Sequence, residues 1–222
     1  QYISAGITTD HECFTKEEAL DKLQNGMKII IREGSAAKNF EALIDLLHDY
    51  PNQMMFCSDD KHPDSLVIGH INQLCARAVA KGINIYKVLR AACINPVLHY
   101  KLDVGLLREG EAADLIVIKD LEKFEVVKTF INGELVAEDG KSHIKTAKSS
   151  IINRFDCDPV MKEHIYIQRP AGKQMIEVIE ALDGQLITNK YLQDVDSLTL
   201  DDEQEISGNV GIDTLKIVVV NR

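Results

Sequence analysis

The chain has 222 residues, of which 45% are hydrophobic, and its formal net charge at pH 7 is −10. This length and composition are typical of a soluble globular protein of one or two domains. Lysine and arginine total 25 against 35 acidic residues, without a basic stripe, and this balance disfavours nucleic-acid binding.

The sequence carries no signal for membrane insertion or secretion. A run of about eighteen apolar residues is missing, and the N-terminus lacks the basic and apolar regions of a signal peptide. We therefore expect no membrane partner and a cytoplasmic location. The chain starts at Gln1 instead of methionine, so we expect a fragment or a processed piece. The five cysteines, without C-x-x-C spacing, are expected to be reduced thiols.

The first hundred residues alternate short apolar runs with amphipathic segments. "AGITT" (5–9), "MKIII" (27–31) and "QMMFC" (53–57) predict strands, because they are short, continuous and apolar or β-branched. Four helices are predicted around them, at 15–25, after a cap at Ser35 or Asn39, at about 66–81 and at about 86–93.

Capping and proline signals set the ends of these helices. Thr15 and Glu18 fit a capping box at the start of the first helix. Tyr50-Pro51 is expected to end the second and Asn95-Pro96 the last, because proline interrupts helical hydrogen bonding. His70 lies in the third helix with apolar neighbours, and this position indicates packing.

Strands alternating with helices are the signature of parallel βαβ units. In barrels and open sheets of this kind, functional groups gather at the carboxyl ends of the strands. Here those ends read Asp10-His11-Glu12, Arg32-Glu33-Gly34-Ser35 and Ser58-Asp59-Asp60-Lys61-His62. One such run alone is as well explained by a solvated loop, but three together favour a site. An imidazole and a carboxylate on different strands suit a divalent metal that activates water.

Other common catalytic motifs are missing from the sequence. There is no G-x-S-x-G elbow to mark Ser35 or Ser58 as a nucleophile. Neither glycine-rich phosphate-loop pattern occurs. The zinc deaminase signature H-x-E with P-C-x-x-C is absent as well, since His11 and Glu12 are adjacent.

Beyond Pro96 the pattern becomes β-rich. A strand is predicted at 114–118, followed by a hairpin whose Asn132-Gly133 turn is the favoured type I′ pair. "KSHIKTAKSS" (141–150) is expected to be a polar linker. Further strand signals are "HIYIQR" (164–169), "QMIEVIEALDGQLIT" (174–188) and "TLKIVVVNR" (214–222), and the acidic run 194–205 predicts a solvated loop.

Several of these stretches resemble one known family. "GITTDHECFTKEEALDKLQNGMKIIIREGSAAKN", "MFCSDDKHPD", "GHIN", "NPVLHYKLDVGLLREGEAADLIVI" and "INGELVAEDGK" are similar to the bacterial adenine deaminases of the amidohydrolase superfamily. The resemblance is dense over about residues 1–145 and looser to the end.

This resemblance implies an α/β fold, the C-terminal part of a metal-dependent (β/α)₈ barrel, with strands six to eight. It implies a partial barrel at 1–104, a β-sandwich segment at 105–145 and a β-rich C-terminal domain at 146–222. The implied reaction is the hydrolytic deamination of adenine to hypoxanthine and ammonia, with manganese or iron activating water for attack on carbon 6.

The resemblance also implies roles for residues at the strand ends. His11 corresponds to the metal-binding histidine that ends the sixth strand. Asp59 corresponds to the aspartate that ends the eighth, which binds metal and carries a proton from water to the leaving amine. Glu33, ending the seventh strand, is expected to meet the purine and take part in catalysis. Ser35, Asp60 and His62 are expected at the substrate, the last two also supporting the metal ligands.

The remaining metal ligands of the family, an H-x-H pair, a bridging carboxylate and a fifth-strand histidine, belong before Gln1. A catalytic metal normally takes three or more protein ligands, so we expect the isolated chain to be inactive. It is expected to form a homo-oligomer or to associate with the missing N-terminal part. Two other hypotheses stay open: an amidohydrolase that acts on a cyclic amide or N-acyl substrate, and a non-catalytic fragment.

Overall fold

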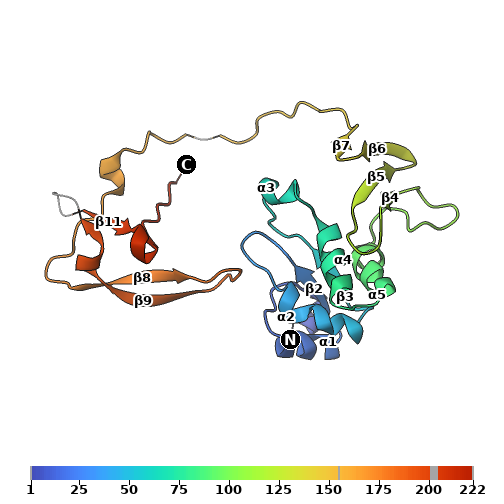
Figure 1. The fold of residues 1–222 in the computed structure, drawn as a ribbon, viewed down its shortest axis with the longest axis horizontal. Coiled ribbons are helices and arrows are strands. Elements are labelled where there is room, and N and C mark those ends of the chain that lie inside the picture. The colour runs from blue at the N-terminus through green and yellow to red at the C-terminus, as the bar shows by residue number, and fades with distance from the viewer. Residues whose placement is uncertain (1, 155, 201–204, 222) are drawn as a thin grey trace. The chain divides into compact units, whose positions relative to one another are not determined.

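A computed structural model describes residues 2–154, 156–200 and 205–221 (Figure 1). The chain divides into two compact units, one of residues 1–146 with 183–186 and one of residues 147–182 with 187–222. All three polar strand ends belong to the first unit. Among the described residues, no helix is both long enough and apolar enough to cross a membrane.

The predicted parallel sheet is present in the first unit. It consists of β1 (Thr9–Asp10), β2 (Lys28–Arg32) and β3 (Met54–Cys57), hydrogen-bonded in this order and parallel throughout. Strand β1 is shorter than predicted. Before it, the chain forms a 3₁₀ turn, η1 (Ile3–Ala5), which ends at Gly6 in a left-handed conformation.

Side chains of the sheet alternate between its two faces, as strand geometry requires. Ile29 and Ile31 of β2, with Met54 and Phe56 of β3, belong to the main hydrophobic core. Ile30 points to the opposite face and is also buried. Burial on both faces is what a continuous apolar strand in a parallel sheet predicts.

Helices pack around β2 and β3, as Figure 1 shows for α1, α2 and α4. The helical segments of this unit are α1 (Lys16–Gln24), α2 (Phe40–Leu43), η2 (Ile44–His48), α3 (Pro63–Leu66), α4 (Ile71–Ala80), α5 (Ile85–Leu89), η3 (Arg90–Ile94) and α6 (Asn95–Tyr100). At the start of α1, the backbone N–H of Glu18 donates to the Thr15 hydroxyl over 3.2 Å, which confirms the Thr15 half of the predicted capping box, while the Glu18 carboxylate accepts from Lys22.

Two helix predictions differ from the structure. The predicted helix 66–81 begins later, as α4 at Ile71, and Leu66 belongs to a separate short helix, α3, which starts at Pro63, where the missing N–H is not needed. Pro96 does not end the last helix. The preceding segment η3 is a π-helix, in which Asn95 N–H donates to Arg90 O, and Pro96 then falls in the first turn of α6.

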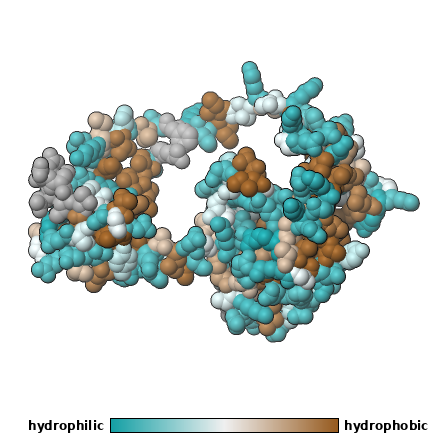
Figure 2. Space-filling view, in the orientation of Figure 1, coloured by the Kyte–Doolittle hydropathy of each residue, from teal (hydrophilic) through white to brown (hydrophobic). Residues whose placement is uncertain are grey.

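Apolar side chains also reach the surface beyond the sheet. Figure 2 shows apolar surface over α3, where Leu66 and the next two residues, Val67 and Ile68, are 44%, 85% and 76% exposed. These residues follow the carboxyl end of β3, so they lie on the segment that carries the polar run.

A four-stranded antiparallel sheet completes the first unit. Its strands are β4 (Leu115–Ile118), β5 (Val126–Ile131), β6 (Glu134–Glu138) and β7 (Lys141–Ser142). Asn132 and Gly133 both have positive φ, 50° and 81°, which is the conformation of a type I′ turn. The predicted strand and hairpin are therefore confirmed.

The second unit is a set of short antiparallel strands. They are β8 (Met175–Ala181), β9 (Thr188–Asp194), β10 (Thr199–Leu200), β11 (Ile206–Asn209) and β12 (Thr214–Leu215), with 3₁₀ turns η4 (Lys162–Ile165), η5 (Val195–Ser197) and η6 (Val210–Ile212). The strand signal at 174–188 is confirmed: it contains β8, Asp183-Gly184 lies between the two strands, and β9 pairs with β8.

Three details of the second unit differ from expectation. Residues 164–169 form a turn and one isolated bridge instead of a strand. The last predicted strand is limited to Thr214–Leu215. In the acidic run, Val195 is buried in a small core and Glu205 is 4% exposed, with its carboxylate 2.5 Å from Lys216 Nζ. Residues 201–204 of that run lie outside the described residues.

We predict that Leu47→Ala lowers the free energy of unfolding by about 2–5 kcal/mol, because Leu47 is fully buried in the main core and its loss leaves a cavity. The matched control is Leu121→Ala, since Leu121 is 50% exposed and its change should stay within about 0.5 kcal/mol. Urea unfolding measures both. Equal effects of the two substitutions would contradict the core described above.

Candidate active site

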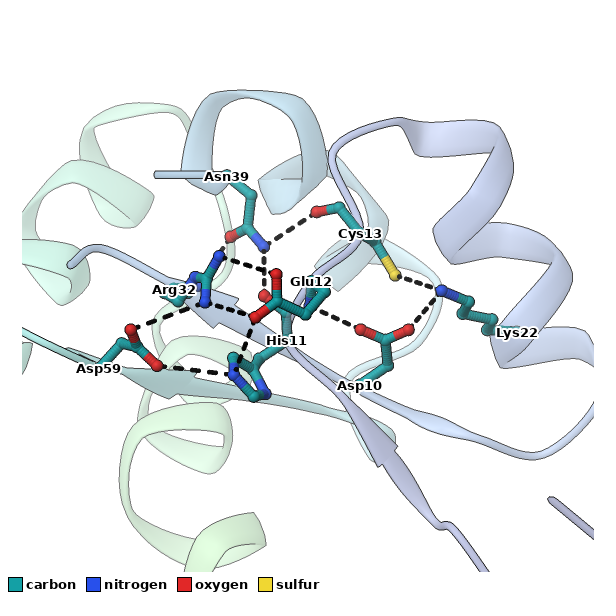
Figure 3. A network of polar contacts seen from close by, with 8 residues as sticks. All are labelled: Asp10, His11, Glu12, Cys13, Lys22, Arg32, Asn39 and Asp59. Atoms are coloured by element: carbon teal, nitrogen blue, oxygen red, sulfur yellow. Dashed lines mark hydrogen bonds and ion pairs between the residues drawn. The ribbon is translucent and has the colours of Figure 1, made fainter. Parts of the chain in front are cut away.

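His11 and Asp59 face each other at the carboxyl end of the sheet (Figure 3). His11 follows β1 and Asp59 follows β3, and His11 Nε2 lies 3.5 Å from Asp59 Oδ1. Both side chains are partly exposed, 44% and 29%. The expectation that parallel strands bring these two residues together is confirmed. One nitrogen and one carboxylate oxygen at this distance suit a shared cation.

Arg32 and Glu12 complete this cluster; both lie in the predicted strand-end runs, but the sequence assigned neither of them a role. The Arg32 guanidinium donates to both oxygens of Glu12, Nη1 to Oε1 over 2.9 Å and Nη2 to Oε2 over 3.3 Å. Arg32 Nη1 also lies 3.6 Å from Asp59 Oδ2. Glu12 Oε1 in turn lies 3.3 Å from His11 Nε2. The four side chains thus form one closed network.

The alternation of β2 explains the position of Arg32. It follows Ile30 by two residues and therefore projects on the face away from the core helices. Asn39 fixes the backbone here: its Oδ1 accepts the Arg32 N–H over 2.7 Å, and its Nδ2 donates to Cys13 O over 3.0 Å and His11 O over 3.4 Å. Asn39 was expected as a helix cap, but its side chain instead ties β2 to the segment after β1.

The segments after β2 and β3 are clamped together. Ser35 N–H donates to Asp60 Oδ1 over 3.1 Å, and His62 N–H donates to the Ser35 hydroxyl over 2.9 Å. A Cβ on Gly34 would lie 2.2 Å from Asp60 Oδ1, so a side chain at this position would displace the Asp60 carboxylate from the clamp. Asp59 itself has φ of 47°, a left-handed conformation that strains most residues and that aspartate tolerates. The clamp holds Asp59 in this conformation.

Glu33 points elsewhere. Its Oε2 lies 2.5 Å from Arg77 Nη1 on α4, and Arg77 stacks on Phe40 at 3.9 Å from the ring centroid. Within the described part of the chain, no hydrogen bond or ion pair joins Glu33 to His11 or Asp59. The period of two along the strand accounts for this, because Glu33 follows Arg32 and takes the opposite direction.

A pocket of about 760 Å³ lies beside the cluster's strand ends. Glu33, Ser35 and His62 line it, and so do the cationic residues Lys38 and Lys61. Three of the four residues expected at the substrate therefore share one pocket. The fourth, Asp60, contributes its carboxylate to the clamp.

A second acidic group resembles a metal site, but a lysine ammonium already bonds to its ligand atoms. Asp10, Cys13 and Glu18 offer ligand atoms within 4.8 Å of one another. Lys22 Nζ bonds to all three, contacting Asp10 Oδ2, Glu18 Oε1 at 2.6 Å and Cys13 Sγ at 3.4 Å. Burial raises the pKa of the Cys13 thiol to about 11, so at neutral pH it is protonated and does not offer a thiolate.

His70 was expected to pack within a helix, and the structure places it just before α4. Its Nε2 lies 2.7 Å from the Ser58 hydroxyl. Burial, together with the charge of Lys61, lowers the pKa of His70 below its usual value. The imidazole is therefore neutral at pH 7, and it supports the segment that carries Asp59. The five cysteines are free thiols, as expected.

Comparison with known proteins identifies what this arrangement is similar to. The model of the amidohydrolase family matches residues 3–136. Curated relatives named adenine deaminase match the whole chain, from Salinibacter ruber at 50% identity over 222 residues, Borreliella afzelii at 46% over 226 and Methanosarcina barkeri at 44% over 229. The resemblance noted in the sequence is confirmed.

The chain spans about 40% of the length of these curated relatives. Among solved structures, a β-aspartyl dipeptidase from Fervidobacterium islandicum matches 60% of this chain and 37% of its own, with 21% identity and a TM-score of 0.48.

We predict that Asn39→Ala destabilises the protein by about 1–3 kcal/mol, because Asn39 is 2% exposed and its loss leaves buried backbone groups without partners. The Arg32 amide should also exchange its hydrogen faster. Asn52→Ala, at an exposed position, is the control. Urea unfolding and hydrogen exchange are measured for Asn39→Ala and Asn52→Ala. An unchanged exchange rate of the Arg32 amide in Asn39→Ala would contradict its hydrogen bond to Asn39.

Proposed function

This chain belongs to the amidohydrolase family, and on that premise we propose that the full-length protein that includes it deaminates adenine, consuming water and releasing hypoxanthine and ammonia. Two observations carry the proposal. The chain is 41–50% identical over its whole length to proteins named adenine deaminase, and it brings His11 and Asp59 within 3.5 Å at the mouth of a parallel sheet.

The proposed architecture assigns β1, β2 and β3 to strands six, seven and eight of a (β/α)₈ barrel. Residues 1–104 then form the end of the barrel, 105–145 a β-sandwich segment and 146–222 a C-terminal β-rich domain. The parallel order of the three strands supports this assignment, because every strand of such a barrel is parallel to its neighbours.

The residues at the strand ends fit a divalent metal. His11 offers an imidazole nitrogen and Asp59 a carboxylate oxygen, a donor set suited to manganese or iron. A bound metal would supply acidity to a water molecule. Two ligands are fewer than a catalytic metal normally takes, so further ligands are proposed to come from the rest of the full-length protein.

The chain's own residues divide the remaining tasks. Asp59 accepts one proton at a carboxylate oxygen as the water oxygen bonds to carbon 6, and delivers it to the exocyclic nitrogen. The bond from carbon 6 to that nitrogen then breaks, ammonia leaves, and the second water proton ends on ring nitrogen N1 of hypoxanthine. Glu33, Ser35 and His62 line the pocket proposed for the purine. Glu33 is an acceptor for a ring N–H there, and its contact with Arg77 holds it at the pocket wall. Asp60 acts through the clamp.

We predict that Asp59→Asn in the full-length protein lowers ammonia release from adenine by about 100-fold or more, because an amide cannot accept the proton. Asp45→Asn is the matched control, since Asp45 is exposed on η2. Ammonia is measured with metal content determined in parallel.

A near wild-type rate of Asp59→Asn with metal still bound would show that another group moves the proton. Cyclic amides and N-acyl substrates are assayed beside adenine. Turnover of these substrates without ammonia release from adenine would overturn the proposed reaction in favour of another amidohydrolase activity.

The 222-residue chain by itself should release no ammonia from adenine, because it offers two metal ligands and, among the described residues, β1 and β3 each pair with a strand on one side only. The apolar surface over α3 favours association as well (Figure 2). We expect oligomers or aggregates in light scattering, and a folded complex when the remaining segment is supplied. A monomeric, cooperatively folded and active 222-residue chain would contradict this.

A further inference from the structure

Arg32 is the buried cation of the proposed site. The residue is 2% exposed, although Glu12, which receives its two hydrogen bonds, has a side chain that is 53% exposed. Burying a charge is unfavourable unless it is paired. The buried charge of Arg32 therefore depends on its carboxylate partners. It lies at the carboxyl end of β2, beside Asp59, the proposed metal ligand.

The geometry shows how the guanidinium is divided between two carboxylates. Glu12 takes Nη1 and Nη2 in a two-point contact, at 2.9 and 3.3 Å. Asp59 Oδ2 lies 3.6 Å from Nη1, which is within ion-pair distance and beyond hydrogen-bond length. The other oxygen of Asp59, Oδ1, faces His11 Nε2 at 3.5 Å. One oxygen of Asp59 thus faces the cation and the other faces the proposed metal ligand.

The Arg32 guanidinium leaves one of its N–H donors unpaired within the described part of the chain. Among the described residues, the buried Arg32 Nε has no acceptor. A buried donor without a partner calls for an explanation, and the two carboxylates supply it: their positions, together with the backbone tie from Asn39, set where the guanidinium lies.

We propose that Arg32 is a positioning residue that holds Asp59 with one oxygen turned to the guanidinium and the other free for the metal, and that Glu12 keeps the guanidinium from binding Asp59 completely. The inference rests on the proposed metal site. Two carboxylates and one guanidinium leave a single net negative charge beside His11, so the cluster attracts a dication without an excess of unpaired acid.

Arg32 and Glu12 act on Asp59 in different ways, so their substitutions should have different effects. Lysine at position 32 keeps the charge but loses the planar fork, so Asp59 loses its fixed orientation. Glutamine at position 12 keeps the shape but removes the competing charge, so the guanidinium moves onto Asp59 and withdraws it from the metal. Both changes should act on Asp59 without removing it.

The test uses the full-length protein and compares Arg32→Lys, Arg32→Met, Glu12→Gln and the double variant with the wild type. Arg108→Met is the control, because Arg108 is exposed and pairs with Glu111 away from the strand ends. Mn²⁺ dissociation constants are measured from the electron paramagnetic resonance signal of free Mn²⁺. Thermal melting, kcat and KM for adenine, and the visible spectrum of Co²⁺-loaded protein complete the set.

We expect Glu12→Gln to raise the Mn²⁺ dissociation constant by about 10–100-fold and Arg32→Lys to lower kcat by a similar factor, with KM within about 3-fold. Each should change the Co²⁺ spectrum, and Arg108→Met should change nothing. In the double variant Arg32→Lys with Glu12→Gln, the loss of Mn²⁺ affinity should be smaller than the product of the losses in the two single variants. The reason is that neither residue then acts on Asp59 as it does in the wild type.

The inference would be overturned if Arg32→Lys and Glu12→Gln had lower melting temperatures but the Mn²⁺ dissociation constant and kcat of the wild type. The Arg32–Glu12 pair would then serve stability alone. These two variants also carry the test if Arg32→Met fails to fold. Wild-type protein that binds no Mn²⁺ would overturn both proposals. Wild-type protein that binds Mn²⁺ but leaves adenine intact overturns only the proposed function; the Co²⁺ spectrum of Arg32→Lys and the Mn²⁺ constant of Glu12→Gln then still decide on the Arg32–Glu12 pair.

Discussion

The central strand β2 is buried on both faces, and the direction of each of its side chains decides what the neighbouring strands do. Ile29 and Ile31 bind the sheet to its helices, and Ile30 and Arg32 project the other way. A charge at the end of such a strand has no route to water, so it must find carboxylates nearby. Glu12 and Asp59, from the strands on either side, supply them. The site is therefore a consequence of packing as much as of chemistry.

Two acidic groups at the same sheet show how position divides their functions. Asp10 pairs in register with Ile29 and so faces the helices, where Lys22 of α1 neutralises it. His11, one residue later, leaves the strand on the side of Arg32 and Asp59. Adjacent residues thus serve stability and the proposed site separately. The partial exposure of His11 and Asp59 is compatible with a ligand that reaches them from the mouth of the sheet.

Much of this arrangement followed from local patterns. Apolar runs of four or five residues gave parallel strands, and parallel strands place their carboxyl ends together, so the meeting of His11 and Asp59 was predictable. The roles of Arg32 and Asn39 were not, because each depends on which side of a strand or loop its side chain takes within a three-dimensional packing. Glu33 shows the same limit: strand-end position alone cannot distinguish two neighbouring residues that point in opposite directions. Pro96 was expected to end a helix. It instead follows the π-helix η3 and lies in the first turn of α6, where its missing N–H is not needed.

The fit between Gly34 and Asp60 makes the segments after β2 and β3 one mechanical part. A side chain at position 34 would displace the Asp60 carboxylate from its bond to the Ser35 N–H, so a change in one segment affects the other. Lys38 and Lys61 line the pocket without making the clamp's two hydrogen bonds, so substitution there can reshape the pocket and leave the clamp in place. Recombination between relatives should accordingly preserve these two segments as a pair inherited from a single parent.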